Sequence, residues 1–294
     1  MKAAARTQQP LQIVPWVLYA CVALIACVVL TFPYDALRAR VLAEVGIHSG
    51  LRVSAVEWHL GWPLGFTGHR VTISQPGRWD VRADQVATSV SVLSLLAGKP
   101  RLDVTAMFPS RVPAEAGIVE AKIVMSAWSE SSPVSLTGRL ERVDLETLKV
   151  KGVAQGRLQG TVEQQWQRSS DGRLMPIGEG NWDARIENVV LDQLPLGTLT
   201  LPTLTIAKAT VTVRCQQRAC QILTFKGDGP DGSFTGTGKL TLGPSALQTN
   251  IEISLVLTPG VGYAQRLTAA GIPMVAGPIM LQVAGSLAQP TVSL

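Results

Sequence analysis

The stretch Leu-Asp-Val-Thr-Ala-Met-Phe (residues 102–108) places an apolar side chain at every second position. Successive side chains of a β-strand point to opposite faces of a sheet, so this alternation predicts a strand with one apolar and one polar face. The same pattern recurs at residues 119–125, 182–187, 251–257 and 279–283. About ten or more such runs, separated by turns rich in Gly and Pro, predict a fold that is mainly β.

The connections between these runs are too short for the crossovers that join parallel strands, so we expect the sheet to be largely antiparallel. Helical spacing is confined to three short segments, residues 34–45, 91–97 and 262–270. A long sheet that is polar on one side must fold over on itself, close, or cover its apolar face with another element. These three arrangements stay open, and the expectation is a long, curved sheet, of the folded-over kind, with a few short helices.

A polar stretch at residues 164–180 interrupts this pattern before the alternation resumes at residue 182. Its composition predicts a long hairpin loop. Such a loop would also mark a weak internal boundary within the β-rich region, residues 35–294.

The first part of the chain is of a different kind, because residues 13–32 contain no charged side chain. About 20 residues of α-helix reach about 30 Å, the thickness of the hydrocarbon core of a bilayer. Aromatic residues favour the membrane interface, and Trp16 and Tyr19 lie near the start of this run. The run from Ile13 to Phe32 is therefore predicted to form a transmembrane helix.

Positive charge on its leading side orients this predicted helix. Lys2 and Arg6 precede it, whereas acidic and basic residues roughly balance after it. Positively charged flanks stay in the cytoplasm, so the prediction is a single-pass membrane protein with its N-terminus in the cytoplasm. Residues 1–34 then hold the cytoplasmic N-terminus and the anchor, and residues 35–294 lie in the periplasm.

Two alternatives to a retained anchor stay open. A cleaved signal peptide fits less well, because the apolar run is longer than a usual signal core and lacks a clear small-residue cleavage site. A lipoprotein signal ending at Cys27 also fits less well, because the apolar run continues through residues 28–30. The simpler interpretation is that Cys21 and Cys27 are small apolar residues facing lipid.

Composition and charge argue against nucleic acid as a partner. The net charge is +5 over 294 residues, aromatic residues make up 5%, and no basic run stands out. Nucleic-acid sites combine clustered basic residues with aromatic side chains, so we expect no nucleic-acid partner.

Cys215 and Cys220 are the two cysteines outside the apolar run, and they flank four residues between two alternating segments. That spacing predicts a β-hairpin with the cysteines opposite each other, within reach of a disulfide. An oxidising periplasm favours the bond. A pair of reduced thiols is the alternative, and metal binding fits less well because no second pair of cysteines or histidines accompanies them.

Two glycine-rich motifs are similar to nucleotide sites. Residues 227–232 read Gly-Asp-Gly-Pro-Asp-Gly and match G-x-G-x-x-G, but a dinucleotide site needs a helix next, and residues 233–242 alternate as a strand. Residues 236–239 read Gly-Thr-Gly-Lys, but Leu240 stands where a P-loop has the Ser or Thr that holds magnesium. We interpret the first motif as a turn and the second as a strand, and expect no cofactor.

The remaining candidates for metal binding or catalysis are equally weak. His48, His59 and His69 are spaced neither as one helix face nor as a tight metal-binding loop. Asp228 and Asp231 have too few oxygen ligands around them for a calcium site. No nucleophile elbow or pair of carboxylates stands out. The chain is therefore predicted to have no catalytic, cofactor-binding or metal-binding residues and not to be an enzyme.

Several short motifs resemble a known family. Phe-Pro-Tyr-Asp-Ala-Leu (residues 32–37) follows the apolar run, and Trp-Pro-Leu-Gly-Phe (62–66) comes before a predicted strand. Ser-Leu-Leu-Ala-Gly-Lys-Pro (94–100) is similar to a helix-and-turn of that family, and residues 285–290 fit its closing Gly-x-Leu-x-x-Pro. With these motifs, best matched over its first third, the chain resembles the type II secretion system protein N family, which is related to AsmA-like proteins.

This resemblance implies an inner-membrane accessory component of the type II secretion apparatus, with a periplasmic β region. It also implies kinship with AsmA-like proteins, whose long curved sheets present an apolar concave face and are associated with lipid handling. Two functions follow as expectations: a scaffold that binds other secretion subunits, and a protein that binds or transfers membrane lipid in an apolar groove of its sheet. Neither family offers catalytic residues, and no small-molecule cofactor is implied.

Overall fold

The computed structural model describes residues 36, 39–40, 42–43, 52–61, 65–75, 79–110, 115–129, 132–148, 153–169, 174–192, 194–196, 199–243, 249–272, 277–286 and 289–293. The chain divides into two compact units, Met1–Gly50 and Leu51–Leu294. Every described strand lies in the second unit, so the sheet, its two faces and its core belong to Leu51–Leu294.

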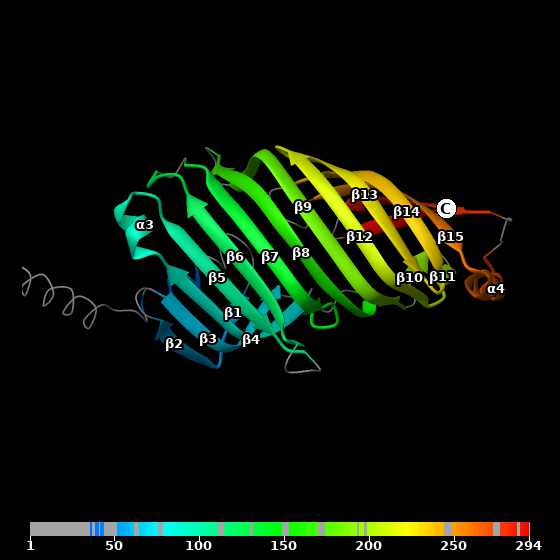
Figure 1. Ribbon diagram of the computed structural model, residues 1–294, viewed down its shortest axis with the longest axis horizontal. Helices are drawn as coiled ribbons and strands as arrows, with labels where there is room; N and C mark the ends of the chain where they lie inside the picture. Colours follow the sequence, from blue (N-terminus) through cyan, green and yellow to red (C-terminus); the bar gives the residue numbers. More distant parts are fainter. Residues whose placement is uncertain are drawn as a thin grey trace, which may run out of the picture. The chain divides into compact units, whose positions relative to one another are not determined.

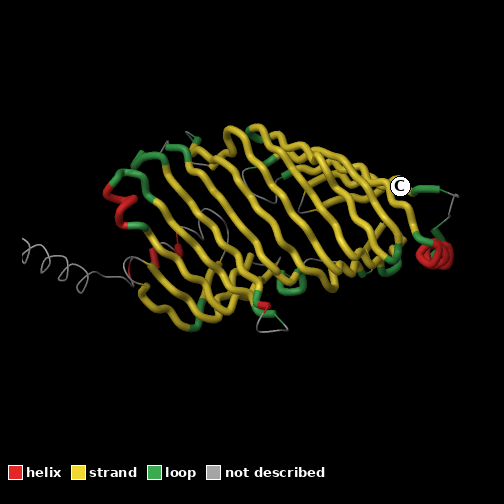
Figure 2. The backbone as a smooth tube through the Cα atoms, in the orientation of Figure 1, coloured by secondary structure: helices red, strands yellow, loops and turns green. Residues whose placement is uncertain are grey.

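The second unit is built on one antiparallel sheet of 15 strands (Figures 1 and 2). The strands are β1 (Arg52–Ser54), β2 (Glu57–Gly61), β3 (Gly65–Gln75), β4 (Trp79–Val90), β5 (Arg101–Phe108), β6 (Gly117–Met125), β7 (Val134–Asp144), β8 (Val153–Arg168), β9 (Leu174–Leu191), β12 (Leu204–Gln216), β13 (Ala219–Gly229), β14 (Gly232–Thr241), β15 (Asn250–Pro259), β16 (Ile279–Ser286) and β17 (Gln289–Ser293). Two further strands, β10 (Leu194–Leu196) and β11 (Leu199–Leu201), pair separately.

The order of the strands in the sheet follows their order in the chain. From β3 onward each strand pairs with the next one along the path, and β1 and β2 both pair with β3. The predictions of a mainly β fold and a largely antiparallel sheet are therefore confirmed. Short connections between successive strands produce this simple order, because a hairpin can only place the next strand beside the last.

Two short helices interrupt the sheet at opposite ends of its strands. Helix α3 (Val92–Leu96) joins β4 to β5, and helix α4 (Val261–Ala269) follows β15. Both were predicted from helical spacing, at residues 91–97 and 262–270, and both predictions are confirmed. Of the third predicted helix, residues 34–45, the five described residues are helical.

No described helix is long and apolar enough to cross a membrane. The predicted anchor at residues 13–32 lies outside the described residues, so the transmembrane helix stays a prediction.

The prediction of a long loop at residues 164–180 is wrong. Strand β8 runs on to Arg168, β9 begins at Leu174, and the two strands stay paired up to the contact of Arg168 with Leu174. The polar sequence concealed the strands because a ladder of backbone hydrogen bonds does not require apolar side chains. A shift in register between Glu163 and Gln165 also breaks the alternation that a sequence pattern depends on.

A second shift in register explains an apparent fault in the apolar pattern of β7. Leu140 and Val143 are separated by an odd number of positions, which in a regular strand places side chains on opposite faces. The register of β7 with β8 shifts between these two residues, and Arg142 adopts a positive φ of 51°. This bulge returns Val143 to the apolar face, where it packs in the same cluster as Leu140.

The apolar side chains gather in three clusters. The first joins Val71 of β3, Ala83 of β4 and Val143 of β7, with Ala55 and Leu148 packed against it from connecting segments. The second packs α4 against β9, β12 and β15, and the third surrounds Cys215 and Cys220. Val71 and Val143 are fully buried, so the end of the sheet that holds the first cluster is closed.

Tyr263 fixes α4 to the second cluster. Its side chain is 1% exposed, and its hydroxyl donates a hydrogen bond to the carbonyl oxygen of Pro202 at 3.2 Å. The guanidinium of Arg266 lies 5.1 Å from the centre of the ring and also donates to Asp231. Burial raises the pKa of the Tyr263 hydroxyl above its usual value, and the Arg266 charge opposes that rise.

Replacing Tyr263 by Phe tests this arrangement. Losing the hydrogen bond to Pro202 is expected to cost about 1 kcal/mol in the free energy of unfolding. The raised pKa in the folded state stabilises the fold fully below the unfolded pKa of about 10, and this contribution is lost as pH rises through the folded pKa. Circular dichroism of thermal unfolding should therefore show stability falling above about pH 10 more steeply in wild type than in Tyr263→Phe. Coincident profiles for the two proteins would contradict the assignment.

Candidate functional site

The residues predicted to anchor the chain, Ile13, Trp16, Tyr19 and Phe32, all lie outside the described residues. The two cysteines predicted to pair do lie in the described sheet. Cys215 and Cys220 occupy opposite positions of the β12–β13 hairpin and are joined by a disulfide. They are 1% and 2% exposed, and Leu240 and Ile253 pack in the same cluster. The bond therefore lies in the core, away from solvent.

The two glycine-rich motifs form strand and turn. Residues 227–232 cover the end of β13, a two-residue turn and the first residue of β14, whereas residues 236–239 lie inside β14. Asp231 in that turn accepts a hydrogen bond from the backbone amide of Thr205 at 2.7 Å and is paired with Arg266. Its carboxylate thus fixes α4 and β12 to the turn.

The described histidines are two residues of the β2–β3 hairpin. The rings of His59 and His69 meet edge to face with their centres 5.5 Å apart. The carboxylate of Glu57 lies 3.7 Å from Nε2 of His59 and 3.3 Å from the guanidinium of Arg70. Within the described residues no group of three or more His, Cys, Asp or Glu side chains is arranged to hold a metal ion. His48 lies outside them.

The register of the sheet aligns apolar positions into continuous rows. One row crosses ten strands, from β5 to β16, and contains only Ala, Val, Leu, Phe and Gly. Its members are Ala106, Val119, Leu140, Gly160, Ala184, Val211, Phe225, Gly236, Leu255 and Leu281. A parallel row runs through Val104, Ala121, Gly138, Val162, Trp182, Val213, Ile222, Gly238, Ile253 and Val283. Together these rows make a single apolar face.

Part of this apolar face is only partly covered by the described residues. One cluster takes in Val119, Leu140 and Leu158, but no cluster includes the apolar side chains of β5, β6, β7 and β8 nearer to α3. These side chains are partly exposed, and we call them the open stripe: Leu102, Val104, Ala121, Ile123, Leu136 and Val162. None of them is among the fully buried side chains or the exposed large hydrophobic side chains of the described residues, so the stripe is a partly covered apolar surface.

Two polar groups border the open stripe. Gln164, 2% exposed, donates its side-chain amide to the carbonyl oxygens of Gln165 and Ile177 at 3.2 and 3.3 Å. Its side-chain oxygen has no partner, and neither has the indole nitrogen of Trp182 on the neighbouring strand. Both atoms are buried, so they add to the cost of folding and offer no accessible recognition group.

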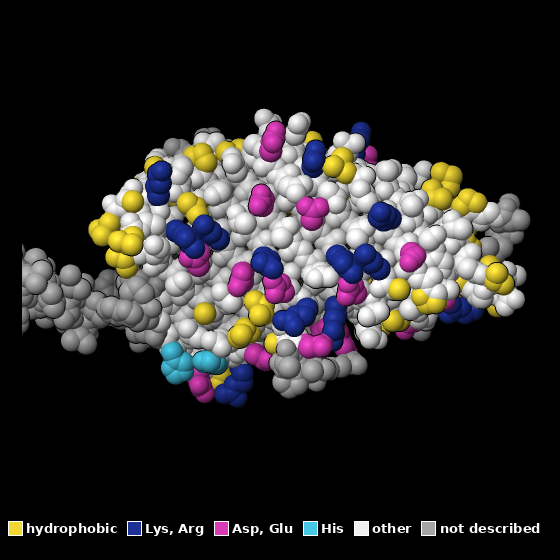
Figure 3. Space-filling view, viewed as in Figure 1, with side chains coloured by type: hydrophobic (Ala, Val, Ile, Leu, Met, Phe, Trp, Pro, Cys, Tyr) yellow, Lys and Arg dark blue, Asp and Glu magenta, His cyan; other side chains and the backbone are white. Residues whose placement is uncertain are grey.

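The opposite face of the sheet is polar and carries charges of both signs (Figure 3). Arg139 pairs with Glu141, and Arg185 pairs with Glu187, each at 2.6 Å. Asp183 accepts a hydrogen bond from the Thr212 hydroxyl at 2.8 Å. Apart from Glu187, these side chains line a shallow depression of about 600 Å³ across β7, β8, β9 and β12.

The ion pairs of Arg139 and Arg185 run along their own strands, and exposed pairs of this kind contribute little stability. The hydroxyl of Thr210, also in the lining of the depression, is buried and has no hydrogen-bond partner among the described residues.

Comparison with protein-family models, with curated proteins and with solved structures found no match.

Sequence reasoning found the apolar face but missed which part of it is open. The alternation of 102–108 and 119–125 gave the direction of the side chains, whereas burial depends on what folds over them. The sequence analysis also did not identify the exposed apolar side chains of α3. The signal that could have identified them is Trp128, a large aromatic residue within a polar loop.

Removing the Cys215–Cys220 bond is expected to lower stability modestly. The cysteines are 5 positions apart, and closing so short a loop in the unfolded chain stabilises the fold by roughly 2 kcal/mol. Thermal unfolding of Cys215→Ala/Cys220→Ala, compared with Cys21→Ala/Cys27→Ala as the matched control, measures the difference. Equal unfolding temperatures for the two double variants would contradict the prediction.

Proposed function

We propose that this chain is an accessory component of the type II secretion apparatus, anchored in the bacterial inner membrane and acting in the periplasm by binding other subunits. The observation that carries the proposal is the polar face of the sheet, a broad surface with a depression lined by Arg139, Glu141, Asp183 and Arg185. A charged surface of both signs selects its partners by electrostatic complementarity.

The motifs behind the family resemblance support this proposal through their places in the fold. Residues 94–100, similar to a helix-and-turn of that family, hold the end of α3 and the turn at Gly98, which has a φ of +73°. The closing Gly-x-Leu-x-x-Pro pattern spans the β16–β17 connection, where Gly285 pairs with Pro290. Both motifs thus lie at corners of the sheet.

The open ends of the sheet offer a further means of binding. Strand β17 pairs with β16 on one side, and β1 and β2 pair with β3 at the other end of the path. An edge strand presents unpaired backbone groups, to which an extended segment of another subunit can add.

Charge reversal in the depression tests the secretion proposal. The full chain is recovered from detergent-solubilised membranes of cells that contain the secretion subunits, and co-purified proteins are identified by mass spectrometry. Arg139→Glu/Arg185→Glu is expected to reduce recovery of those subunits several-fold, because like charges at a contact oppose binding. Both arginines are solvent-exposed in their ion pairs, so the fold should survive.

The matched control is Arg82→Glu on β4, which reverses an exposed, ion-paired arginine away from the depression. It should leave recovery unchanged. Absence of every secretion subunit from the wild-type sample would overturn the proposal, and equal losses in both variants would remove the depression as the binding surface.

Lipid binding is a second candidate function, favoured by the open stripe. Val104, Ile123 and Val162 present partly exposed aliphatic side chains on the apolar face, and acyl chains are the natural complement of such a surface. Each CH₂ group that is buried there contributes about 0.8 kcal/mol. The same chain can hold lipid on one face of the sheet and a protein on the other.

Two neighbouring substitutions separate lipid binding from a general effect on the sheet. Val162 points to the apolar face and Thr161 to the polar face, so Val162→Glu places a charge in the open stripe and Thr161→Glu does not. Photoactivatable fatty acids incorporated into membrane lipids should cross-link to wild type and to Thr161→Glu, and much less to Val162→Glu. Equal cross-linking in the two variants, or none in wild type, would contradict lipid binding at the open stripe.

A further inference from the structure

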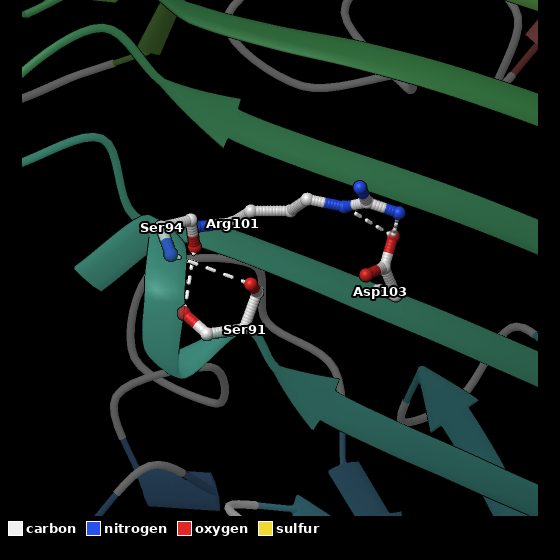
Figure 4. Close-up of polar contacts among 4 residues, drawn as sticks. All are labelled: Ser91, Ser94, Arg101 and Asp103. Atoms are coloured by element: carbon white, nitrogen blue, oxygen red, sulfur yellow. Dashed lines mark hydrogen bonds and ion pairs between the residues drawn. The ribbon is translucent and has the colours of Figure 1, made fainter. Parts of the chain in front are cut away.

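The corner between β4 and β5 is held in shape by a small polar network (Figure 4). The backbone amide of Ser94 donates to the Ser91 hydroxyl at 3.4 Å, and the Ser94 hydroxyl donates to the Ser91 carbonyl at 2.7 Å. The backbone amide of Arg101 donates to the Ser94 hydroxyl at 3.2 Å, so the first residue of β5 is tied to α3. The Arg101 Nε–H also donates a hydrogen bond to the carboxylate of Asp103 at 3.0 Å.

This network is needed because α3 is too short to be stable by itself. A helix of 5 residues cannot offset the cost of its first turn, and none of the residues of α3 is buried. Burial of apolar surface therefore does not explain why the segment is helical. What the network achieves is to fix the directions in which the α3 side chains leave the sheet.

The apolar side chains of α3 point into solvent. Leu93 is 80% exposed and Leu96 is 81% exposed, and Val92 beside them is also exposed. Trp128 from the β6–β7 connection is 66% exposed, and its indole nitrogen donates to the carbonyl oxygen of Leu95 at 3.4 Å. Figure 3 shows hydrophobic side chains gathered at the end of the sheet where Figure 1 places α3. We call Val92, Leu93, Leu96 and Trp128 the corner patch.

An exposed lysine lies beside the corner patch. Lys99 is exposed in a segment, residues 91–102, that contains no Asp or Glu, whereas the charge of Arg101 is paired with that of Asp103. A tryptophan beside exposed leucines and a lysine is the composition that favours the interface of a lipid bilayer, where the indole lies at headgroup level and the leucines enter the acyl region.

We propose that the corner patch inserts into the interfacial layer of a lipid bilayer and is a second membrane contact of this chain. Four side chains are too few for a stable protein interface, which covers about 800 Å² on each partner. A single interfacial contact is weak alone, but a second attachment to the same membrane makes it effective. The predicted anchor at residues 13–32 supplies that attachment. The inference depends neither on the secretion role nor on lipid in the open stripe.

Fluorescence quenching of Trp128 tests the insertion. The full chain is reconstituted in nanodiscs of a zwitterionic and anionic lipid mixture, with and without brominated acyl chains. The contribution of Trp128 is the difference between wild type and Trp128→Phe, which removes the effect of the other tryptophans. We expect brominated lipid to quench this contribution, because bromine on an acyl chain quenches only indoles that reach it.

The leucines are tested by substitution. Leu93→Ser/Leu96→Ser is expected to shift the ratio of inserted to free corner patch by about tenfold or more, with a matching loss of Trp128 quenching. The matched control is Val261→Ser, because Val261 on α4 is also 81% exposed but lies at the opposite ends of the strands. This variant should be quenched as wild type is.

Two outcomes would overturn the proposal. One is equal quenching of wild type and Trp128→Phe, which means that Trp128 does not reach the bilayer. The other is a loss of quenching in Val261→Ser equal to that in Leu93→Ser/Leu96→Ser. Unchanged circular dichroism spectra of the variants ensure that each result reports on insertion and not on folding.

Discussion

The register of the antiparallel hydrogen-bond ladder is the constraint on which the rest of the structure depends. Each strand must place its apolar side chains on the same face as those of its neighbours, and a slip by one residue would reverse them. The row that begins at Ala106 and ends at Leu281 shows this alignment held over ten strands. Where the chain departs from strict alternation, as at Arg142, a bulge restores the alignment before the next strand.

The strands could be predicted because alternation is a local property of the sequence. The exposure of each face could not be predicted, because it depends on which distant segments pack against it. Residues 102–108 reveal their strand and both of its faces without any tertiary knowledge. The strands through 164–180 escaped prediction because their polar side chains carry no periodic signal, although their backbone pairs normally. The helix at 91–97 was predictable from spacing, whereas the exposure of Leu93 and Leu96 depends on the absence of a described element packing on them.

A single sheet also has to limit how much apolar surface it leaves in water. This chain does so by local means: α4 with Tyr263 at one corner, the cluster around Val71 and Val143 at another, and the disulfide at a third. The open stripe remains between them. The described residues bury its side chains only in part, so this stripe is a remaining cost of the arrangement that the proposed lipid contact would relieve.

The positions of the disulfide and of α4 have a mechanical consequence. Cys215 and Cys220 join β12 and β13 at one end, and α4 packs against β9, β12 and β15 at the other end of the strands. This half of the sheet is therefore braced at both ends and resists bending. Near α3, the described part of β5, β6, β7 and β8 is tied by the hydrogen bonds of Ser94 and Trp128 and has no disulfide. Because neither a disulfide nor a buried helix braces its described part, we expect the half that carries the open stripe to change its curvature more readily than the half that holds Cys215 and α4.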